Sequence, residues 1–498
     1  MKKRILSLLL VLSMLAGLWV MPAAAETEME NVTPMEGECP CGCGKTLDAV
    51  DWKAWTGDPK EGHYYLDGNY TQAAMATVLS DTTVVLDLRG CAITTESTSR
   101  LFLVNGFLHV MDTVGGGRMM AKTPKGEDGG ILCVEENESL RPAFYLHSGT
   151  MTPDKGSAKA ACGGLVYVGN SATFRMTGGV LMNGHAETAY GGGAVGTKHS
   201  SSTIEILGGK IINCSTNSNG GSLYSSGIVR VENCYISGGV AGGWGGNIHI
   251  SGTTASLTVK NAKIINGVST GTTTSANRYG GGNINVYSGA SADISDSVIT
   301  GGYAACAGGN LCLGRGNTVV KNTTITGGMA PAGANVYGSL TSSKGTFDTC
   351  TIDGGVYQGS APLTLKGATK IGGTGLQLGT GSVTATGLTS GAEVYVQGNK
   401  TITGNAAYIK AADRANIAAN GNALAVSLAT AGEGYCSNCK TNVTWQPYGT
   451  ENATHVYLTE NLELSAQVEV STELVVDLAG FGITAEGRAF YVAAGGSL

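Results

Sequence analysis

A pair of glycines followed by a short apolar segment recurs along most of this chain, about every 25 to 35 residues. The copies begin at Gly129, Gly163, Gly192, Gly220, Gly245, Gly281 and Gly308, and a degenerate copy begins at Gly333. A fixed period of this length is typical of proteins in which one repeat stacks on the next. The period therefore constrains the fold, whereas function has to be argued from individual sites.

Between the glycine pairs, apolar and polar residues alternate with a period of two, and the segments are separated by turns rich in Gly, Asn, Ser and Thr. This pattern is typical of strands. One apolar anchor per repeat occurs at Leu181, Ile211, Ile236, Ile264, Ile299, Ile325 and Ile352. Each repeat then holds about three short strands, and the sequence predicts an all-β, right-handed parallel β-helix, because parallel crossovers are almost always right-handed.

Asparagine recurs at two fixed positions of the repeat. One set is Asn247, Asn283, Asn310 and Asn335, and the other is Asn233, Asn261 and Asn322. Stacked asparagine side chains can hydrogen-bond from coil to coil and satisfy backbone groups at the corners. We predict that both sets stabilise the fold and do not bind a ligand.

Composition excludes some other classes. Glycine accounts for 78 of 498 residues and proline for only 10, so collagen and proline-rich disorder both fit poorly. The formal net charge is −6, and the basic residues are spread singly. Without a basic stripe, nucleic acid is not an expected partner.

The first 25 residues have the pattern of a secretory signal peptide. Lys2, Lys3 and Arg4 precede an apolar run, and Ala23-Ala24-Ala25 provides small residues for cleavage. No other segment approaches the 18 apolar residues of a spanning helix. We expect a secreted or cell-surface protein with no membrane span after signal cleavage.

Two groups of cysteines are closely spaced, and each is followed by a histidine. The first group is Cys39, Cys41 and Cys43 before His63, and the second is Cys436 and Cys439 before His455. In an exported chain the favoured interpretation is local disulfides. The histidines keep metal binding open, because Cys and His together are zinc ligands. No other cofactor is expected, and cysteines such as Cys214, Cys234, Cys312 and Cys350 are expected to be small core residues.

The two Cys groups also mark a longer repeat, offset by about 390 residues. Residues 84–94, which include Leu86-Asp87-Leu88, match residues 474–484, which include Val476-Asp477-Leu478. Four segments follow: a signal peptide at 1–25, a Cys-rich lead at 26–62, a parallel β-helix at 63–430, and the start of a second module at 431–498. We expect the chain to be part of a longer protein of tandem modules.

These motifs resemble the openings of β-helix modules in large secreted proteins of Gram-positive gut anaerobes. The resemblance rests on the Cys group, the Trp, the pattern Leu-Asp-Leu-x-Gly-x-x-Ile-Thr from Leu86 to Thr94, and Arg-x-Phe-x-Val from Arg100 to Val104. The Gly-Gly-Asn-Ile coils are more loosely similar to the repeats of chlamydial polymorphic membrane proteins. The resemblance implies a pectate-lyase-like fold and an adhesin-like role at the cell surface.

A catalytic site is not evident in the sequence. Glycoside hydrolysis needs two carboxylates about 5–10 Å apart, and the one close acidic pair of the main repeats, Asp293 and Asp296, has a spacing that places the two on opposite sides of a strand. Four basic residues are expected to lie without acidic neighbours: Arg230, Lys260, Arg278 and Arg315. His185 is expected at a corner. Whether the protein is an enzyme stays uncertain, and the balance is against it.

Aromatic residues precede several glycine pairs. They are Tyr190, Trp244, Tyr279 and Tyr303, and the repeat predicts that they form one strip along the rod. Exposed rings of this kind stack on sugars, although a role in capping the apolar core is slightly favoured. Together with the adhesin-like resemblance and the lack of an evident catalytic site, these residues lead us to expect a non-catalytic protein for adhesion. It would contact glycans or molecules of host or neighbouring cells. The alternatives are a lyase or hydrolase of pectin-like polysaccharides and a structural spacer.

Overall fold

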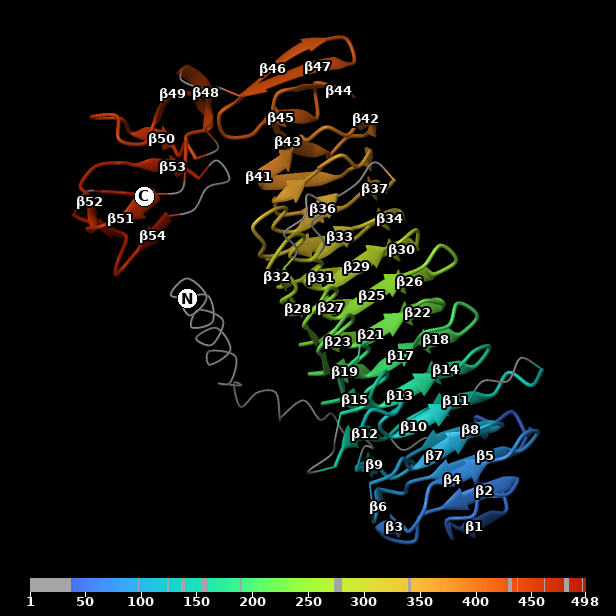
Figure 1. The fold of residues 1–498 in the computed structure, drawn as a ribbon. Coiled ribbons are helices and arrows are strands. Elements are labelled where there is room, and N and C mark those ends of the chain that lie inside the picture. Colours follow the sequence, from blue (N-terminus) through green and yellow to red (C-terminus); the bar gives the residue numbers. More distant parts are fainter. Residues whose placement is uncertain are drawn as a thin grey trace.

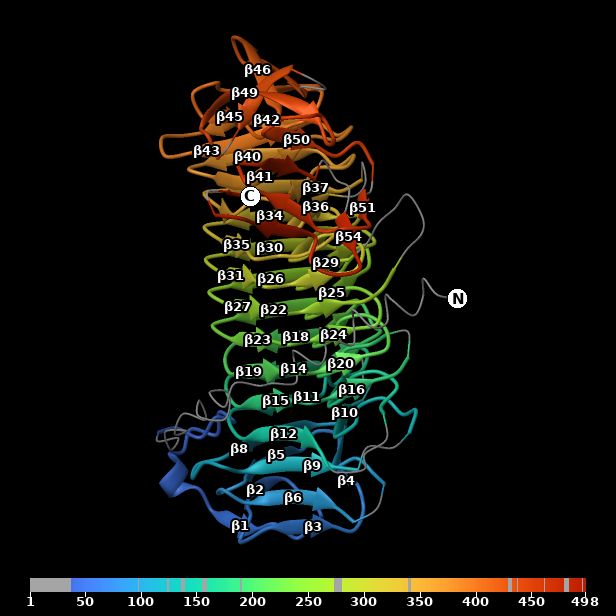
Figure 2. The same ribbon diagram turned by 90° about the vertical axis from the view of Figure 1, so that its left-hand side faces the viewer.

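Three columns of parallel strands run along one rod, because each coil of the chain contributes one strand to each column (Figure 1). The computed structural model describes residues 37–498, with gaps at 97, 123–124, 136–138, 155–158, 189, 273–279, 339–341, 429–431, 437, 461, 479–482 and 495. The predicted signal peptide at 1–25 lies outside the described residues. Figure 2 shows the coils stacked along a single axis, from the blue to the orange end. The right-handed parallel β-helix predicted from the repeat is confirmed.

The first column is a 17-stranded sheet. Its parallel strands, in the order of their pairing, are β1 (Trp52–Ala54), β2 (Gly62–Tyr65), β5 (Thr83–Asp87), β8 (Phe107–Met111), β11 (Ala143–Leu146), β14 (Thr173–Met176), β18 (Thr203–Ile206), β22 (Ile228–Glu232), β26 (Ser256–Lys260), β30 (Ser291–Ser295), β34 (Asn317–Lys321), β37 (Lys344–Asp348), β40 (Leu363–Gly367), β42 (Val383–Leu388) and β44 (Lys400–Gly404).

The other two columns join into one 25-stranded sheet, because β41 (Lys370–Gln377) pairs with strands of both. The second column consists of β3 (Tyr70–Gln72), β6 (Ala92–Thr95), β9 (Arg118–Ala121), β12 (Thr150–Pro153), β15 (Val180–Met182), β19 (Lys210–Ile212), β23 (Tyr235–Ser237), β27 (Lys263–Ile265), β31 (Val298–Thr300), β35 (Thr324–Thr326) and β38 (Thr351–Ile352). The third consists of β4 (Ala76–Val78), β7 (Phe102–Val104), β10 (Leu132–Val134), β13 (Val166–Val168), β17 (Val195–Thr197), β21 (Leu223–Ser225), β25 (Ile248–Ser251), β29 (Ile284–Tyr287), β33 (Leu311–Leu313), β36 (Val336–Gly338), β39 (Val356–Tyr357), β43 (Glu393–Gln397) and β45 (Ile409–Ala411).

A short five-stranded sheet widens one corner of the middle coils. Its strands are β16 (His185–Ala186), β20 (Ser215–Thr216), β24 (Val240–Ala241), β28 (Val268–Ser269) and β32 (Tyr303–Ala304). His185 lies here, as expected for a corner residue, with Nδ1 2.7 Å from the Ser215 hydroxyl.

The core of the rod is the predicted apolar ladder. The anchors from Leu181 to Ile352 pair with one another in register from coil to coil. All of them are at most 1% exposed. Cys214, Cys234, Cys312 and Cys350 are buried as well, which confirms the prediction that they are small core residues.

The glycine pairs occur where the chain turns tightly into the third column. Gly220, for example, has φ +68°, and a Cβ there would lie 2.1 Å from the carbonyl oxygen of Leu223. A side chain at this position would collide with backbone, so only glycine fits. The period that marks the sequence is thus the period of one backbone turn.

The predicted asparagine ladder is confirmed for the inner set. Asn247 donates to the side-chain oxygen of Asn283 at 2.7 Å, and Asn283 donates to Asn310 at 2.7 Å. Asn310 donates to Asn335 at 2.6 Å. The same oxygens accept the backbone N–H groups of corner glycines such as Gly239 and Gly267. These amides therefore tie adjacent coils together inside the rod.

The outer set occupies left-handed turns on the surface. Asn233, Asn261 and Asn322 have φ values of 51°, 48° and 46°. Asn261 donates to Asn233 at 2.8 Å, while Asn322 donates to Asp296 at 3.2 Å. Asparagine tolerates this conformation better than most residues. The left-handed turn therefore explains asparagine at these positions as well as the hydrogen bond between coils does.

The ends of the rod differ from the prediction. β1 lies within the predicted lead segment, because Trp52 already pairs in register with His63. At the other end, β46 (Ala415–Asn420) and β47 (Ala423–Leu428) form an antiparallel hairpin that pairs with β44. An antiparallel hairpin gives the last parallel strand a partner, which covers an otherwise open edge.

Residues 432–498, the second module, contain the same three-column pattern on a smaller scale. A four-stranded sheet holds β48 (Gly432–Cys436), β49 (Thr441–Pro447), β50 (His455–Tyr457) and β53 (Val475–Asp477). Two parallel pairs complete it: β51 (Leu462–Leu464) with β54 (Ile483–Ala485), and β52 (Val468–Val470) with β55 (Phe490–Val492). Figure 1 shows this module in red beside the orange end of the rod.

The predicted long repeat is visible in the strand register. His63, Tyr64 and Tyr65 pair with Val85, Leu86 and Asp87 in the rod. In the second module, His455, Val456 and Tyr457 pair with Val475, Val476 and Asp477. The sequence match between the two openings is therefore also a match in structure.

Candidate binding surface and metal-ligating clusters

The structure brings two of the predicted aromatic residues onto one surface over the third column. Tyr190 is 45% exposed and lies edge-on to Tyr224, with ring centroids 6.0 Å apart. Trp244 is half-buried and lies 6.3 Å from His249 and 5.6 Å from Tyr287. We call these five residues the aromatic surface.

Tyr224 and His249 connect the two predicted residues. Their rings are stacked, 5.5 Å apart at an interplanar angle of 9°, because the two residues are paired in register on β21 and β25. Both are nearly buried, so the accessible part of the surface consists of Tyr190, Trp244 and Tyr287. Tyr224 and His249 cover the sheet, while the other three rings reach solvent.

The other two predicted residues do not join this surface in the described structure. Tyr303 lies on β32, where it pairs with Val268 on a different sheet. Tyr279 lies outside the described residues. The single strip expected from the repeat is therefore incomplete, because a position before the glycine pair does not fix where a long corner directs its side chain.

The sequence contained a signal for the residues that were missed. Several aromatic or imidazole side chains occur four residues after the first glycine of a pair: Tyr167, Tyr224, His249 and Tyr337. These positions lie on β13, β21, β25 and β36 of the third column, of which β21 and β25 are neighbours. Tyr337 continues the pattern by stacking on Tyr357 at 5.2 Å.

Polar groups without partners lie beside the aromatic surface. Asn285 pairs in register with His249 and is fully buried, yet neither atom of its side-chain amide has a hydrogen-bond partner. Nδ1 of His249 is also without a partner. Burial lowers the pKa of His249 to about 3, so its imidazole is neutral at ordinary pH.

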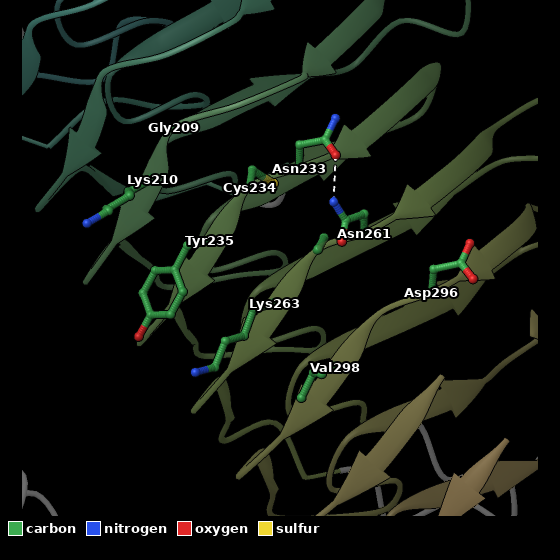
Figure 3. Close-up of a pocket in the computed structure, with 10 residues that line it drawn as sticks. Gly209, Lys210, Asn233, Cys234, Tyr235, Asn261, Lys263, Asp296 and Val298 are labelled. Carbon is green, nitrogen blue, oxygen red and sulfur yellow. Dashed lines mark hydrogen bonds between the residues drawn. The ribbon is translucent and has the colours of Figure 1, made fainter. Parts of the chain in front are cut away.

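An open depression lies elsewhere, across β19, β23, β27 and β31 (Figure 3). Lys210, Tyr235 and Lys263 occupy the same register position on successive strands. Figure 3 shows the three side chains pointing out to one side. The Lys263 ammonium lies 5.9 Å from the centre of the Tyr235 ring. This surface combines an aromatic ring with positive charge, so it suits an anionic ligand.

A row of charged residues on the first column corrects one expectation. Arg230 was predicted to have no acidic neighbour, but it lies 3.0 Å from Glu205 and 2.9 Å from Glu232. Arg175 also contacts Glu205, at 2.6 Å. Glu232 is only two positions from Arg230 in the sequence. Glu205 becomes a neighbour because parallel stacking places residues about 25 to 30 positions apart next to each other.

Two histidines form a pair on the same face of the first column. His109 Nδ1 lies 3.1 Å from His147 Nε2, and His109 stacks on Tyr145 at 4.3 Å. Burial, followed by the charge of the other imidazole, lowers the pKa of His109 to about 3. Burial, followed by the charge of Arg175, lowers the pKa of His147 to about 4.

The most buried carboxylates are bound by backbone. Asp112 accepts hydrogen bonds from the N–H groups of Gly90, Gly115 and Gly117. Asp87, in the Leu-Asp-Leu motif, accepts from the N–H and hydroxyl groups of Thr113. Carboxylates held in this way stabilise turns and do not resemble the free acid and base of a hydrolase.

The first Cys group and its histidine converge on one point. Cys39 and Cys41 each have Sγ 3.3 Å from Nε2 of His63, and Cys43 Sγ lies 3.9 Å from the same atom. The sulfurs of Cys39 and Cys41 are 3.1 Å apart. None of the cysteines that the structure describes is joined in a disulfide. Burial raises the pKa of the Cys39 thiol to about 12 and lowers the pKa of His63.

The second Cys group repeats this arrangement with three residues. Cys439 Sγ lies 3.2 Å from Nε2 of His455, and its backbone N–H contacts Cys436 Sγ at 3.4 Å. Among the described residues, only these two groups gather three or more potential metal ligands within 4.8 Å. The sequence had named these cysteines but had not shown that the histidines face them.

No family model, no curated protein and no solved structure matches this chain. Within the described part of the chain, no helix has the length and apolar character needed to cross a membrane.

Proposed function

We propose that this chain is an exported β-helix protein that contacts glycans at the cell surface without catalysis. The aromatic surface carries the proposal. Its accessible rings, Tyr190, Trp244 and Tyr287, are spread over successive coils and held by the stacked pair beneath them. Flat rings fixed along a rigid rod suit an extended polysaccharide, because sugar faces stack on aromatic faces with little loss of side-chain entropy.

The rings, and not the polar groups near them, carry the proposal. The amide of Asn285 and Nδ1 of His249 have no hydrogen-bond partner, but these atoms are buried and do not face a ligand on the surface. The predicted signal peptide and the resemblance to adhesin-like β-helix proteins support the cell surface as the place of action.

The test is a glycan array with the signal-free chain, including pectins and mucin-type sugars, read for retention and for released product. Trp244→Ala should lose most of the retention. Tyr303→Ala is the matched control, since it removes an aromatic ring on another sheet and should leave retention unchanged. Equal losses in both variants, or retention that survives Trp244→Ala, would count against the aromatic surface.

The depression with Lys210 and Lys263 supports a second candidate, an acidic glycan such as a polyuronate. Its distinguishing property is salt dependence, because charge neutralisation weakens as ionic strength rises. A Lys210→Gln/Lys263→Gln variant should then lose retention of pectin while retaining neutral sugars. Release of product in any of these experiments would favour the lyase or hydrolase alternative over a binding protein.

A further inference from the structure

The two Cys/His clusters lie at equivalent places, at the start of the rod and at the start of the second module. In the rod, Trp52 pairs with His63, and the two rings are 5.5 Å apart at 81°. In the second module, Trp445 and His455 are 5.4 Å apart at 85°. A tryptophan at the equivalent position thus lies nearly perpendicular to the ligating imidazole in both places.

The first cluster has the geometry of a tetrahedral site. With Zn–S near 2.3 Å and Zn–N near 2.0 Å, a tetrahedron puts two sulfurs about 3.8 Å apart and a sulfur and a nitrogen about 3.6 Å apart. The observed distances from sulfur to His63 Nε2 are 3.3, 3.3 and 3.9 Å, and the four ligand atoms all lie within 4.8 Å of one another. The sulfurs of Cys39 and Cys41 are 3.1 Å apart, so they must separate by about 0.7 Å when the ion enters. A disulfide would join only two of the three sulfurs and would leave the imidazole without a role.

The segment that carries these cysteines has almost no apolar core to hold it. Of residues 37–51, only Cys39 and Val50 are buried, and the 3₁₀ turn η2 (Leu47–Ala49) buries nothing. A few backbone bonds shape it, including those from Cys39 to Lys45 and from Leu47 to Gly37. Segments with so little buried area need a metal or a disulfide to stay ordered.

We infer that Cys39, Cys41, Cys43 and His63 bind Zn²⁺ and that this ion fastens residues 37–51 to β2 at the β1 end of the rod. The cysteines bind as thiolates, so three protons leave the sulfurs for solvent when the ion enters, while His63 binds through Nε2 as the neutral ring. A closed set of four protein ligands is typical of a structural site and leaves no position for substrate.

The second cluster binds Zn²⁺ with lower affinity. Cys436, Cys439 and His455 provide three ligands among the described residues, and solvent can complete the tetrahedron. Cys436 and Cys439 also pack against Trp445 and Tyr457 in a small apolar cluster. That packing holds the second site partly in shape without the ion, so chelation should disturb it less than the first.

Zinc binding by the two clusters is tested by measuring the metal content of the protein. The signal-free chain, purified without chelator, should carry about one tightly held zinc, measured by elemental analysis and native mass spectrometry, plus a second that a mild chelator removes. Cobalt in place of zinc should give the charge-transfer absorption of cobalt–thiolate bonds. Cys41→Ser should lose the tight ion and Cys439→Ser the weak one.

The control is Cys91→Ser, which removes a partly buried cysteine outside both clusters and should keep both ions. If Cys41→Ser fails to fold, His63→Gln tests the same site without removing a thiol. A chain that binds no metal and weighs two hydrogens less for each pair of cysteines would overturn the inference in favour of disulfides. Metal retained by the Cys41→Ser/Cys439→Ser variant would also overturn it, by showing that the ion lies elsewhere.

Discussion

The opening of the rod and the second module have the same strands in the same register, yet they differ in burial. Ile93 is fully buried on β6, whereas Ile483, at the matching place on β54, is half-buried. Val104 on β7 is also fully buried, while Val492 on β55 is 45% exposed. In the rod, a further coil covers each of these residues; the described part of the second module has no third coil. The local sequence pattern therefore determines where the strands form, whereas the stacking of a further coil determines how deeply their side chains are buried and how stable they are.

The largest expected effect is the loss of stability of the rod in acid. His109, His147 and His249 lie in the rod, and burial holds their pKa values at about 3, 4 and 3. Between pH 6.5 and about 4 they stay neutral when folded, while the unfolded chain takes up protons, so stability falls as pH falls through this window. Each histidine can cost up to about 1.4 kcal/mol per pH unit. Urea unfolding at pH 7 and pH 5 measures the loss.

The matched variant for this prediction is His249→Gln. It removes one of the three groups, so its stability should depend less steeply on pH. An unchanged slope would show that His249 is protonated in the folded chain or that carboxylates dominate the acid response.

The burial difference itself can be tested with one substitution in each region. Ile93→Ala should lower the free energy of unfolding of the rod by about 3 kcal/mol, because a fully buried side chain leaves a cavity. Ile483→Ala should cost about 1 kcal/mol or less at a half-buried site. Hydrogen exchange read separately over the two regions measures both. Equal costs would mean that the second module buries this residue as deeply as the rod does.

The buried asparagine ladder gives the next effect. Asn283→Ala removes the acceptor for the N–H of Gly267 and for Asn247, as well as the donor to Asn310. Leaving these buried groups unpaired should cost about 2 kcal/mol and lower the melting temperature. Asn261→Gly is the control, since it removes a surface bond while keeping the left-handed turn. An unaltered melting curve for Asn283→Ala would refute a stabilising ladder.

The smallest expected effect concerns how the second module attaches to the rod. Arg414 lies 3.1 Å from Asp477 and 3.8 Å from the centre of the Tyr457 ring. Arg89 makes the equivalent contacts to Asp87 and Tyr65 within the rod. Arg414→Gln should cost about 1 kcal/mol, more than Arg89→Gln, because Arg414 is the more buried of the two.

Limited proteolysis between the rod and the second module measures this effect. Arg414→Gln should speed cleavage there, whereas Arg89→Gln should not. Identical cleavage rates for both variants would show that Arg414 does not hold the two parts together.

Much of the fold could be predicted because its determinants repeat along the chain. The glycine pairs, the isoleucine anchors and the inner asparagines all recur once per coil, and each is required by one backbone turn or one buried column. The sequence predicted the two ends of the rod less well. An antiparallel hairpin, β46 and β47, ends the predicted parallel β-helix, since the repeat contains no information about how its own last strand is covered.

Candidate sites were predicted less completely. The repeat pointed to Tyr190 and Trp244 but missed Tyr224 and His249, which lie between them and belong to the sheet. It also separated Arg230 from Glu205, although stacking makes them neighbours. Tyr190 and Tyr224 are 34 positions apart, and Arg230 and Glu205 are 25 apart. These residues meet because the strands of successive coils stay in register.

The sequence by itself determined the three-column coil, its inward ladder and the long repeat that starts again near Cys436, because each depends on local spacing and on the conformations open to glycine and asparagine. Only the tertiary structure decided which rings share a surface, which charges pair, and that His63 and His455 face the sulfurs of their Cys groups. Those relations join different coils, and the distance between side chains on different coils depends on how the coils stack.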